Sequence, residues 1–205
     1  MAYSSPSTYK LEKIGRKIYH ISGGLILIGL YARLGRPAGL ALLIAVFAFA
    51  TSLDIARLRI PTFNSFIYRY FPKFIRESER DRLTGTPWYM LGILCAAAFY
   101  DVPVAAYAVA FLACGDVAAT TVGEKWGTIK ISGVKSLQGT IAFIVAATVS
   151  GAVINYFFFP VSPLVFIAGA AVAAGVELLP VNLNDNLTIP IIAGGIMLIM
   201  LSAGL

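Results

Sequence analysis

The sequence predicts an all-α protein: a polytopic bundle of about seven transmembrane helices, built as a single integral membrane domain over residues 1–205. Three observations support this fold class. The chain is 59% hydrophobic and only 13% charged, about half of the ~25% charged residues usual in a soluble domain. Its apolar residues gather in runs of about the length of a membrane span. Its basic residues lie almost entirely between alternate runs, as in membrane proteins of fixed orientation.

Seven apolar runs are expected to cross the membrane, which requires about 20 residues for each helical span. The third run is short, and Asp116 interrupts the fourth. The turn residues Tyr100 to Pro103 separate these two runs, as a tight connection between antiparallel helices requires. The expected spans are roughly residues 18–34, 37–55, 86–101, 102–122, 138–159, 162–179 and 188–204.

Lysine and arginine residues predict the orientation. With a cytoplasmic N-terminus, all of the 16 basic residues except Arg33 and Arg36 lie on the cytoplasmic side, and the C-terminus lies outside. The net charge of +6 is then explained by topology and by attraction to anionic lipid. It does not indicate nucleic acid, because the basic residues form no tail with interleaved aromatic residues.

The second cytoplasmic-side loop, from Arg57 to Thr84, predicts an additional helix. Aromatic and aliphatic residues recur at helical spacing from Phe63 to Ile75, with Arg69 and Lys73 among them. An amphipathic pattern of this kind is typical of a helix that lies in the membrane interface. A helix packed against the underside of the bundle is an equal alternative.

Most polar residues suited to chemistry fall at the cytoplasmic ends of the expected spans. This asymmetry favours a site that faces the cytoplasm over a transport pathway, which needs polar groups at the midplane and beyond. Asp116 and Asp185 are hard oxygen ligands suited to magnesium beside phosphate. Arg16 and His20 share one helix face, so both can meet phosphate, or His20 can move a proton. Glu177 suits a metal ligand, a base or a structural partner of a lysine.

The segment from Gly115 to Gly127, followed by Lys135 and Ser136, places an acid, glycines and lysines before the start of an apolar helix. Glycine-rich turns and helix N-termini bind phosphate groups. The segment is not a P-loop, because Val134 stands where that motif needs glycine. A lysine that reaches the membrane surface and a serine helix cap are the alternatives. The candidate phosphate-binding residues are Arg16, Lys17, Arg82, Gly115, Gly123, Lys125, Gly127, Lys135, Ser136, Gly139 and Thr140.

Five sequence pieces, taken in order, resemble the CTP-dependent lipid-alcohol kinases, a family that includes dolichol kinase, phytol kinase and yeast-type diacylglycerol kinase. This family is distantly related to the phosphatidate cytidylyltransferases. The pieces are Arg16-Lys17-x-x-His20; Glu79-Arg80-Asp81-Arg82 before Gly85, Tyr89 and Gly92; Gly115-Asp116 through Gly123 and Gly127; Lys135-Ser136-x-x-Gly139-Thr140; and Glu177 with Asp185-Asn186-x-x-x-Pro190. The resemblance therefore covers most of the chain.

The resemblance implies transfer of the γ-phosphoryl group of CTP to the hydroxyl of a membrane isoprenoid alcohol, of the phytol, geranylgeraniol or polyprenol type, with Mg²⁺ as cofactor. Phosphoryl transfer depends on positioning and charge neutralisation. We therefore expect catalysis from Asp116, His20 and Glu177, and metal binding by Asp116, Asp185 and Asn186. Whether Asp116 is the base or a metal ligand stays open.

Two alternatives remain at the level of the sequence. One is a CTP-dependent cytidylyltransferase that makes a CDP-activated lipid, which is the weaker interpretation because an apolar span directly follows Lys135 and Ser136. The other is a small membrane transporter or lipid-binding protein without enzymatic activity. The expected partners are CTP, a membrane lipid alcohol and the bilayer, and a homodimer is left open.

Overall fold

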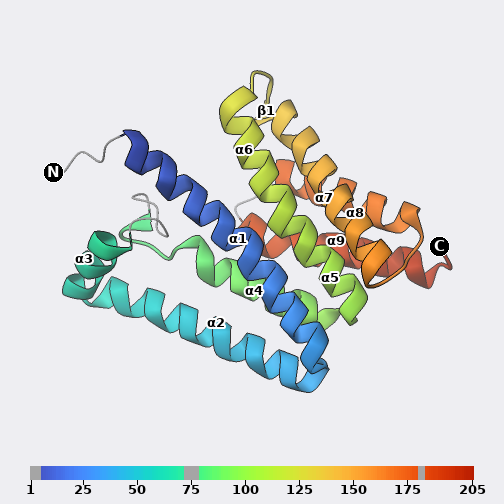
Figure 1. The fold of residues 1–205 in the computed structure, drawn as a ribbon, viewed down its shortest axis with the longest axis horizontal. Helices are drawn as coiled ribbons and strands as arrows, with labels where there is room; N and C mark the ends of the chain where they lie inside the picture. The colour runs from blue at the N-terminus through green and yellow to red at the C-terminus, as the bar shows by residue number, and fades with distance from the viewer. Residues whose placement is uncertain (1–5, 72–78, 180–182) are drawn as a thin grey trace.

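A computed structural model of the chain describes residues 6–71, 79–179 and 183–205, with side chains from residue 14 onward in the first helix. This part of the protein is helical apart from one two-stranded hairpin, which confirms the all-α prediction (Figure 1). The helices are α1 (Pro6–Leu34), α2 (Arg36–Arg59), α3 (Pro61–Tyr70), α4 (Gly85–Phe99), α5 (Val102–Ala110), the π-helical segment η2 (Phe111–Gly115), α6 (Asp116–Trp126), α7 (Leu137–Phe157), α8 (Pro163–Leu178) and α9 (Asp185–Ser202). The strands β1 (Lys130–Ser132) and β2 (Lys135–Ser136) pair antiparallel between α6 and α7.

The helix starts follow local sequence signals of two kinds. α2, α3, α5 and α8 each carry proline in the first turn, where its missing N–H leaves no hydrogen bond unmade. α4, α7 and α9 instead follow a polar residue whose side chain accepts a hydrogen bond from a backbone N–H in the first turn. These cap residues are Thr84, Ser136 and Asn184, respectively. Such caps satisfy amide groups that would otherwise lack a partner.

Four of the described helices are long and apolar enough to cross a bilayer: α2, the continuous helix Val102–Trp126, α7 and α9. α4 and α8 are apolar but shorter. The 15 residues of α4 reach only about 22 Å, less than the ~30 Å of a typical hydrocarbon core. Each of the seven expected spans overlaps a helix, but the number that crosses the membrane stays a prediction.

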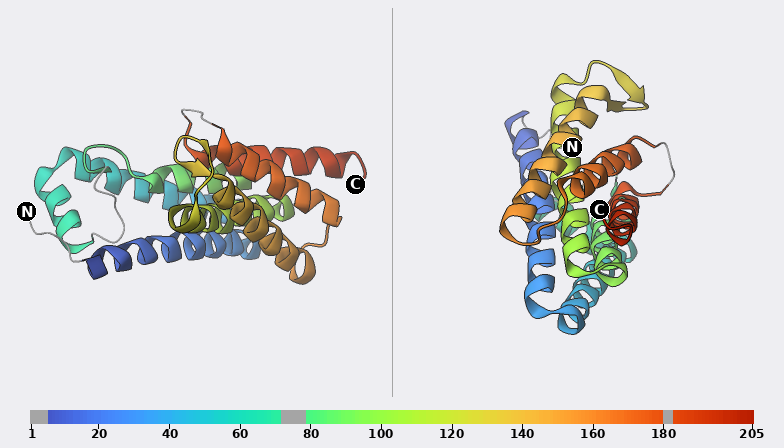
Figure 2. Two further views of the ribbon diagram at one scale, coloured as in Figure 1. Left: turned by 90° about the horizontal axis from the view of Figure 1, so that it is seen from above. Right: turned by 90° about the vertical axis from the view of Figure 1, so that its right-hand side faces the viewer.

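The continuous helix from Val102 to Trp126 runs through the middle of the bundle (Figures 1 and 2). Its first part, α5 and η2, is almost wholly buried, with α1, α4, α7, α8 and α9 packed around it. Close packing depends on small residues. A Cβ on Gly169 of α8 would lie 2.8 Å from Met197 Cγ of α9 and 2.9 Å from Phe111 Cε2, as is common where membrane helices approach closely.

α3 lies at the far end of the molecule from the C-terminus (Figures 1 and 2). The predicted helical pattern from Phe63 to Ile75 is confirmed as a helix up to Tyr70, while residues 72–75 of that pattern lie outside the described part of the chain. None of its residues is buried. Its location in a membrane interface stays a prediction.

α4 and α9 cross so closely that glycine is required at one point. A Cβ on Gly92 would lie 2.0 Å from the carbonyl oxygen of Asn186, at the start of α9. We expect Gly92→Ala to force the two helices apart, at a cost of roughly 1–3 kcal/mol. The apparent melting temperature of the detergent-purified protein should fall.

Gly29→Ala is the matched control, because a Cβ at that helical position meets nothing within 4 Å. Alanine is the better helix former by roughly 0.5–1 kcal/mol, so this variant should melt at the wild-type temperature or slightly above it. Equal melting temperatures for the two variants would contradict the close crossing of α4 and α9.

Candidate active site

A cavity of about 750 Å³ lies where α1, α4, α6, the β-hairpin and the start of α9 come together. Its volume is within the range of ligand-binding pockets. The starts of two capped helices, at Thr84 and Asn184, form part of its wall. Of the residues predicted for the site, the lining includes Arg16, Lys17, His20, Arg82, Asp116, Lys135, Asp185 and Asn186.

Asp116 and His20 face each other across this cavity. Asp116 begins α6 directly after the π-helical segment η2, an element often found at functional sites. Its Oδ2 lies 3.7 Å from Nε2 of His20 on α1. A carboxylate beside an imidazole is an arrangement that can accept and pass a proton.

Tyr89 of α4 fixes the position of His20. The two rings stack with centroids 4.0 Å apart, and the Tyr89 hydroxyl donates a 2.6 Å hydrogen bond to the carbonyl oxygen of His20. Gly24, one turn further along α1, leaves room for this hydroxyl, since a Cβ there would lie 2.0 Å from it. His20 is therefore held from α4 while its ring faces α6.

Lys135 joins three elements on the other side of the cavity. From β2, its Nζ lies 2.8 Å from Asp185 Oδ2 at the start of α9 and 3.4 Å from Glu177 Oε1 on α8. It also donates a hydrogen bond to the Glu177 carbonyl oxygen. Glu177 is buried and is not among the described residues that line the cavity. Of the three roles considered for Glu177, the geometry matches the structural partner of a lysine.

The glycines predicted to bind phosphate lie at the junction of α6 and α7. Ser136 Oγ caps α7 by accepting the Gly139 N–H at 3.2 Å. A Cβ on Gly127 would lie 2.5 Å from this oxygen, and one on Gly123 or Gly139 would lie 3.2 Å from it. The absence of side chains at these glycines therefore lets the two helices meet around Ser136.

Three further predicted residues also serve packing or lie at the surface. A Cβ on Gly115 would lie 2.6 Å from the Phe143 ring, and the Thr140 hydroxyl donates to the Ser136 carbonyl oxygen. The Lys125 ammonium lies over the Trp126 ring, 4.4 Å from its centroid. Neither these three nor Gly123, Gly127, Ser136 and Gly139 are among the described lining residues. Their contact with phosphate stays a prediction.

The predicted metal ligands supply oxygen atoms from two sides of the same cavity, Asp116 from α6 and Asp185 with Asn186 from α9. In the described part of the chain, no group of three or more His, Cys, Asp and Glu residues is placed to hold a metal ion. This donor set fits Mg²⁺, which takes one or two carboxylates together with substrate phosphates and water. It does not form a cage made of protein alone.

The start of α4 contributes more of the wall than the sequence predicted. Glu79, Thr84, Thr86 and Trp88 line the cavity together with Tyr89. The signal was present in the run Thr-Gly-Thr-Pro at residues 84–87, which is typical of a helix start. The run also lies at the same end of its expected span as the other candidates do, which is the signal that could have added it to them.

Comparison with known proteins shows which family this chain resembles. The chain is 30% identical, over 89% of its length, to the CTP-dependent diacylglycerol kinase 1 of Eremothecium gossypii and to that of Saccharomyces cerevisiae. This chain belongs to the CTP-dependent lipid kinases. The family predicted from the sequence pieces is thereby confirmed. The alignments span 65% and 71% of the length of these two relatives, so the chain is shorter than either protein.

The chain is also similar to the phytol kinase of Synechocystis sp., with 29% identity over 87% of the chain and 76% of the length of that relative. No family model matches the chain, and no solved structure matches it. The pieces that resembled the family converge in space, since each of the five contributes at least one residue to the cavity.

The Lys135 cluster generates a stability prediction. Lys135→Gln leaves the buried Glu177 carboxylate without its cation, and Glu177→Gln leaves the lysine with the Asp185 carboxylate as the remaining negative charge of the cluster. Each single change should lower the apparent melting temperature, because an unmatched buried group costs about 1–3 kcal/mol. The double variant should lose less than the sum of the two, with a coupling of about 0.5–3 kcal/mol. Additive losses in the thermal melts would contradict the pairing.

Proposed function

We propose that this chain transfers the γ-phosphoryl group of CTP to the hydroxyl group of a membrane lipid alcohol. One observation supports it most strongly: a single cavity gathers basic side chains, four carboxylates and a histidine in a chain of the CTP-dependent lipid kinase family. Phosphoryl transfer needs this combination, because catalysis depends on positioning and on stabilising charge at the phosphate oxygens.

In the proposed mechanism, Arg16, Lys17 and Arg82 bind the phosphates of CTP from one side of the cavity and Lys135 binds them from the other. The alcohol oxygen forms a bond to the γ-phosphorus while the bond from that phosphorus to the bridging oxygen breaks. The products are CDP and a lipid phosphate. The hydroxyl proton passes to the Asp116 carboxylate, with His20 at 3.7 Å to receive it.

Mg²⁺ is the proposed cofactor, with Asp116, Asp185 and Asn186 as its protein ligands. When bound, the ion neutralises charge on the nucleotide phosphates. Asp185 is 2.8 Å from the Lys135 ammonium, so this lysine stays beside the metal-binding carboxylate and the phosphates together. When Asp185 alone of the two carboxylates binds the metal, Asp116 is left to serve as the base.

An isoprenoid alcohol of the phytol, geranylgeraniol or polyprenol type is the first proposed acceptor. Diacylglycerol is the second, favoured by the alignment with fungal enzymes named as diacylglycerol kinases. Both present one hydroxyl on a long apolar body. The apolar body would lie in the bilayer between helices, and the hydroxyl would reach the cavity beside Asp116 and His20.

The proposed membrane arrangement has seven spans, with the N-terminus and the cavity on the cytoplasmic side and α3 in the interface. Exposed aromatic residues of α3, Phe66 and Tyr70, flank the basic residue Arg69. Aromatic and basic residues together favour the headgroup region of a membrane. CTP is a cytoplasmic solute, so the cavity must face that side for the reaction to proceed.

The test of function is thin-layer chromatography of lipid products made by the purified protein with magnesium. Phytol, geranylgeraniol, diacylglycerol and phosphatidate would be offered separately, each with γ-labelled and α-labelled CTP in parallel. We expect label in a lipid monophosphate from γ-labelled CTP only, and the labelled lipid identifies the acceptor. Label from α-labelled CTP only would establish a cytidylyltransferase instead. No label from either would refute both enzymes.

Asp116→Asn should lower the turnover of the best acceptor by about 100-fold or more, because the amide cannot accept the hydroxyl proton. Asp101→Asn provides the matched control, since Asp101 lies before α5 and pairs with Arg36 away from the cavity. Its turnover should stay close to that of the wild type. Near-normal turnover in Asp116→Asn would remove this residue from the catalytic role.

The proposed orientation predicts opposite sides for the two ends of the chain. A fluorescent reporter fused after Leu205 should fail to fluoresce in bacterial cells, and an alkaline phosphatase fused there should be active. Fusions made after Arg59 should behave in the opposite way, because that position lies on the proposed cytoplasmic side. The same behaviour at both positions would contradict the odd number of spans.

A further inference from the structure

Asp54 and Arg57 form a buried ion pair at the end of α2. Their side chains are only 7% and 2% exposed, and Arg57 Nε donates to Asp54 Oδ1 at 2.5 Å. Neither residue lines the cavity in the described part of the chain. Charges are rarely buried this deeply unless every polar atom is paired, so their partners indicate what they do.

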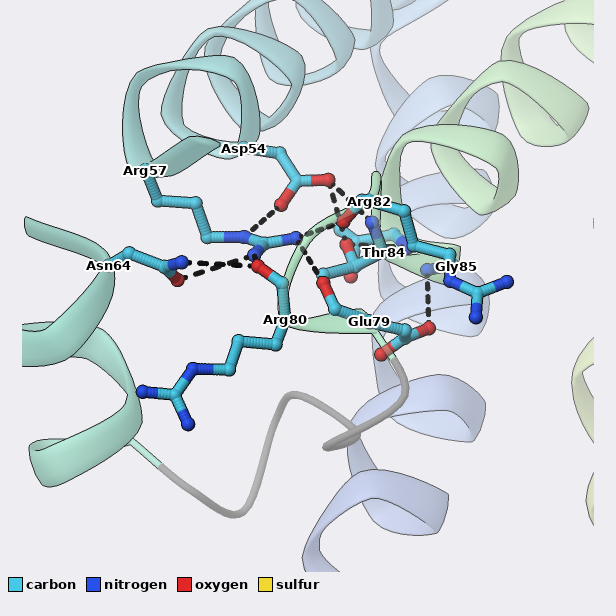
Figure 3. A network of polar contacts seen from close by, with 9 residues as sticks. Asp54, Arg57, Asn64, Glu79, Arg80, Arg82, Thr84 and Gly85 are labelled. Carbon is cyan, nitrogen blue, oxygen red and sulfur yellow. Dashed lines mark hydrogen bonds and ion pairs between the residues drawn. The ribbon is translucent and has the colours of Figure 1, made fainter. Parts of the chain in front are cut away.

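All five N–H donors of the Arg57 guanidinium are engaged (Figure 3). Besides Asp54, the group donates to Asn64 Oδ1 on α3 at 3.4 Å. The other three bonds go to backbone carbonyl oxygens in the turn before α4, with lengths of 3.1, 3.1 and 2.6 Å to residues 79, 80 and 82. A flat group with five fixed donors can hold three carbonyls at once, and the point-like lysine ammonium cannot.

The second oxygen of Asp54 holds the end of the same turn. Its Oδ2 accepts the Thr84 N–H at 2.7 Å and the Thr84 hydroxyl at 3.1 Å. Thr84 in turn caps α4 by accepting the Thr86 N–H, and Glu79 Oε1 accepts the Gly85 N–H at 3.0 Å. The turn 79–84 is therefore held from α2 through the backbone groups of residues 79, 80, 82 and 84.

The side chains of Arg80 and Arg82, both in this turn, point in different directions. The Arg80 guanidinium lies over the Tyr68 ring of α3, 5.5 Å from its centroid. Arg82 instead lines the cavity. The two side chains also point apart in Figure 3. The turn thus decides which arginine is available to a ligand in the cavity.

We propose that Asp54 and Arg57 are positioning residues for the nucleotide: they fix the turn 79–84 so that Arg82 and the start of α4 meet the phosphates of CTP. This inference rests on the proposed kinase function. The two residues at the end of α2 would then support substrate binding without touching the substrate.

The test compares steady-state kinetics and hydrogen exchange in Arg57→Lys, Asp54→Asn and the wild type. Each variant should raise the KM for CTP about tenfold, because it removes charge-assisted hydrogen bonds that support nucleotide binding. The KM for the lipid alcohol should stay within about twofold and kcat within about threefold. Exchange of the Thr84 and Gly85 amide protons should become faster, and this readout does not depend on activity.

Arg36→Lys and Asp101→Asn are the matched controls. They change the same residue types in an exposed pair, 3.7 Å apart, and Arg36 stands at the opposite end of the same helix, about 30 Å from Arg57. Both controls should keep wild-type kinetics and wild-type exchange at Thr84 and Gly85. If Arg57→Lys yields no monodisperse protein, Asn64→Ala takes its place, because Asn64 Nδ2 donates to the Arg80 carbonyl oxygen at 3.1 Å. It should raise the KM for CTP about twofold to threefold.

Two results would overturn the inference. One is an unchanged KM for CTP in variants that fold. The other is a uniform loss of kcat without a change in either KM, which is the expected effect of a merely structural pair. The proposed function fails in a different way: the wild type would then transfer no label from CTP, and the inference would fail with it.

Discussion

The rest of the structure depends on one buried helix, the continuous segment from Val102 to Trp126. Inside a bilayer every backbone polar group needs a partner within the protein, so a chain of this composition folds as helices. Five other helices surround the first part of this one, which leaves no room there for a charged side chain. Asp116 stands where the buried part ends and the cavity begins. A carboxylate is costly at membrane depth, and this position gives it solvent and an imidazole while the scaffold still holds its backbone rigidly.

The charges around the cavity fall into two groups with different tasks. Asp54 and Arg57 are buried and fully engaged, and they act on the backbone of a neighbouring turn. The cavity wall carries both basic and acidic side chains. A polyanionic ligand must therefore compete with the acidic side chains for the basic ones. Lys135 belongs to both groups, because it ties β2 to α8 and α9 and also lines the cavity. Sequence reasoning favoured a phosphate ligand and kept a structural lysine as the alternative, and the geometry combines both positions.

Local patterns made the fold predictable, and long-range pairing limited the prediction of the site. Apolar runs specify helices from their own residues alone, and residues such as Arg16, His20 and Asp116 could be selected because polar groups at span ends are conspicuous. The glycines near Ser136 suggested phosphate binding, yet a Cβ at these positions would meet the Ser136 side chain and nearby backbone atoms, which no single sequence reveals. The contacts of Arg57 with residues 79–82 reach across more than 20 positions. The stacking of Tyr89 on His20 spans an even larger separation.

The π-helical segment η2 makes the length of this stretch matter as much as its composition. An α-helix turns by about 100° for each residue, and η2 holds one wider turn between α5 and α6. This wider turn lets the stretch hold about one residue more than a regular helix while Asp116 still lies at the cavity. With a regular turn in its place, the extra residue would rotate everything after it by that angle, and Asp116 would leave the cavity although every residue of the wall would still be encoded. Natural relatives that are one residue shorter here should therefore form a regular helix through this stretch and keep the acid in place.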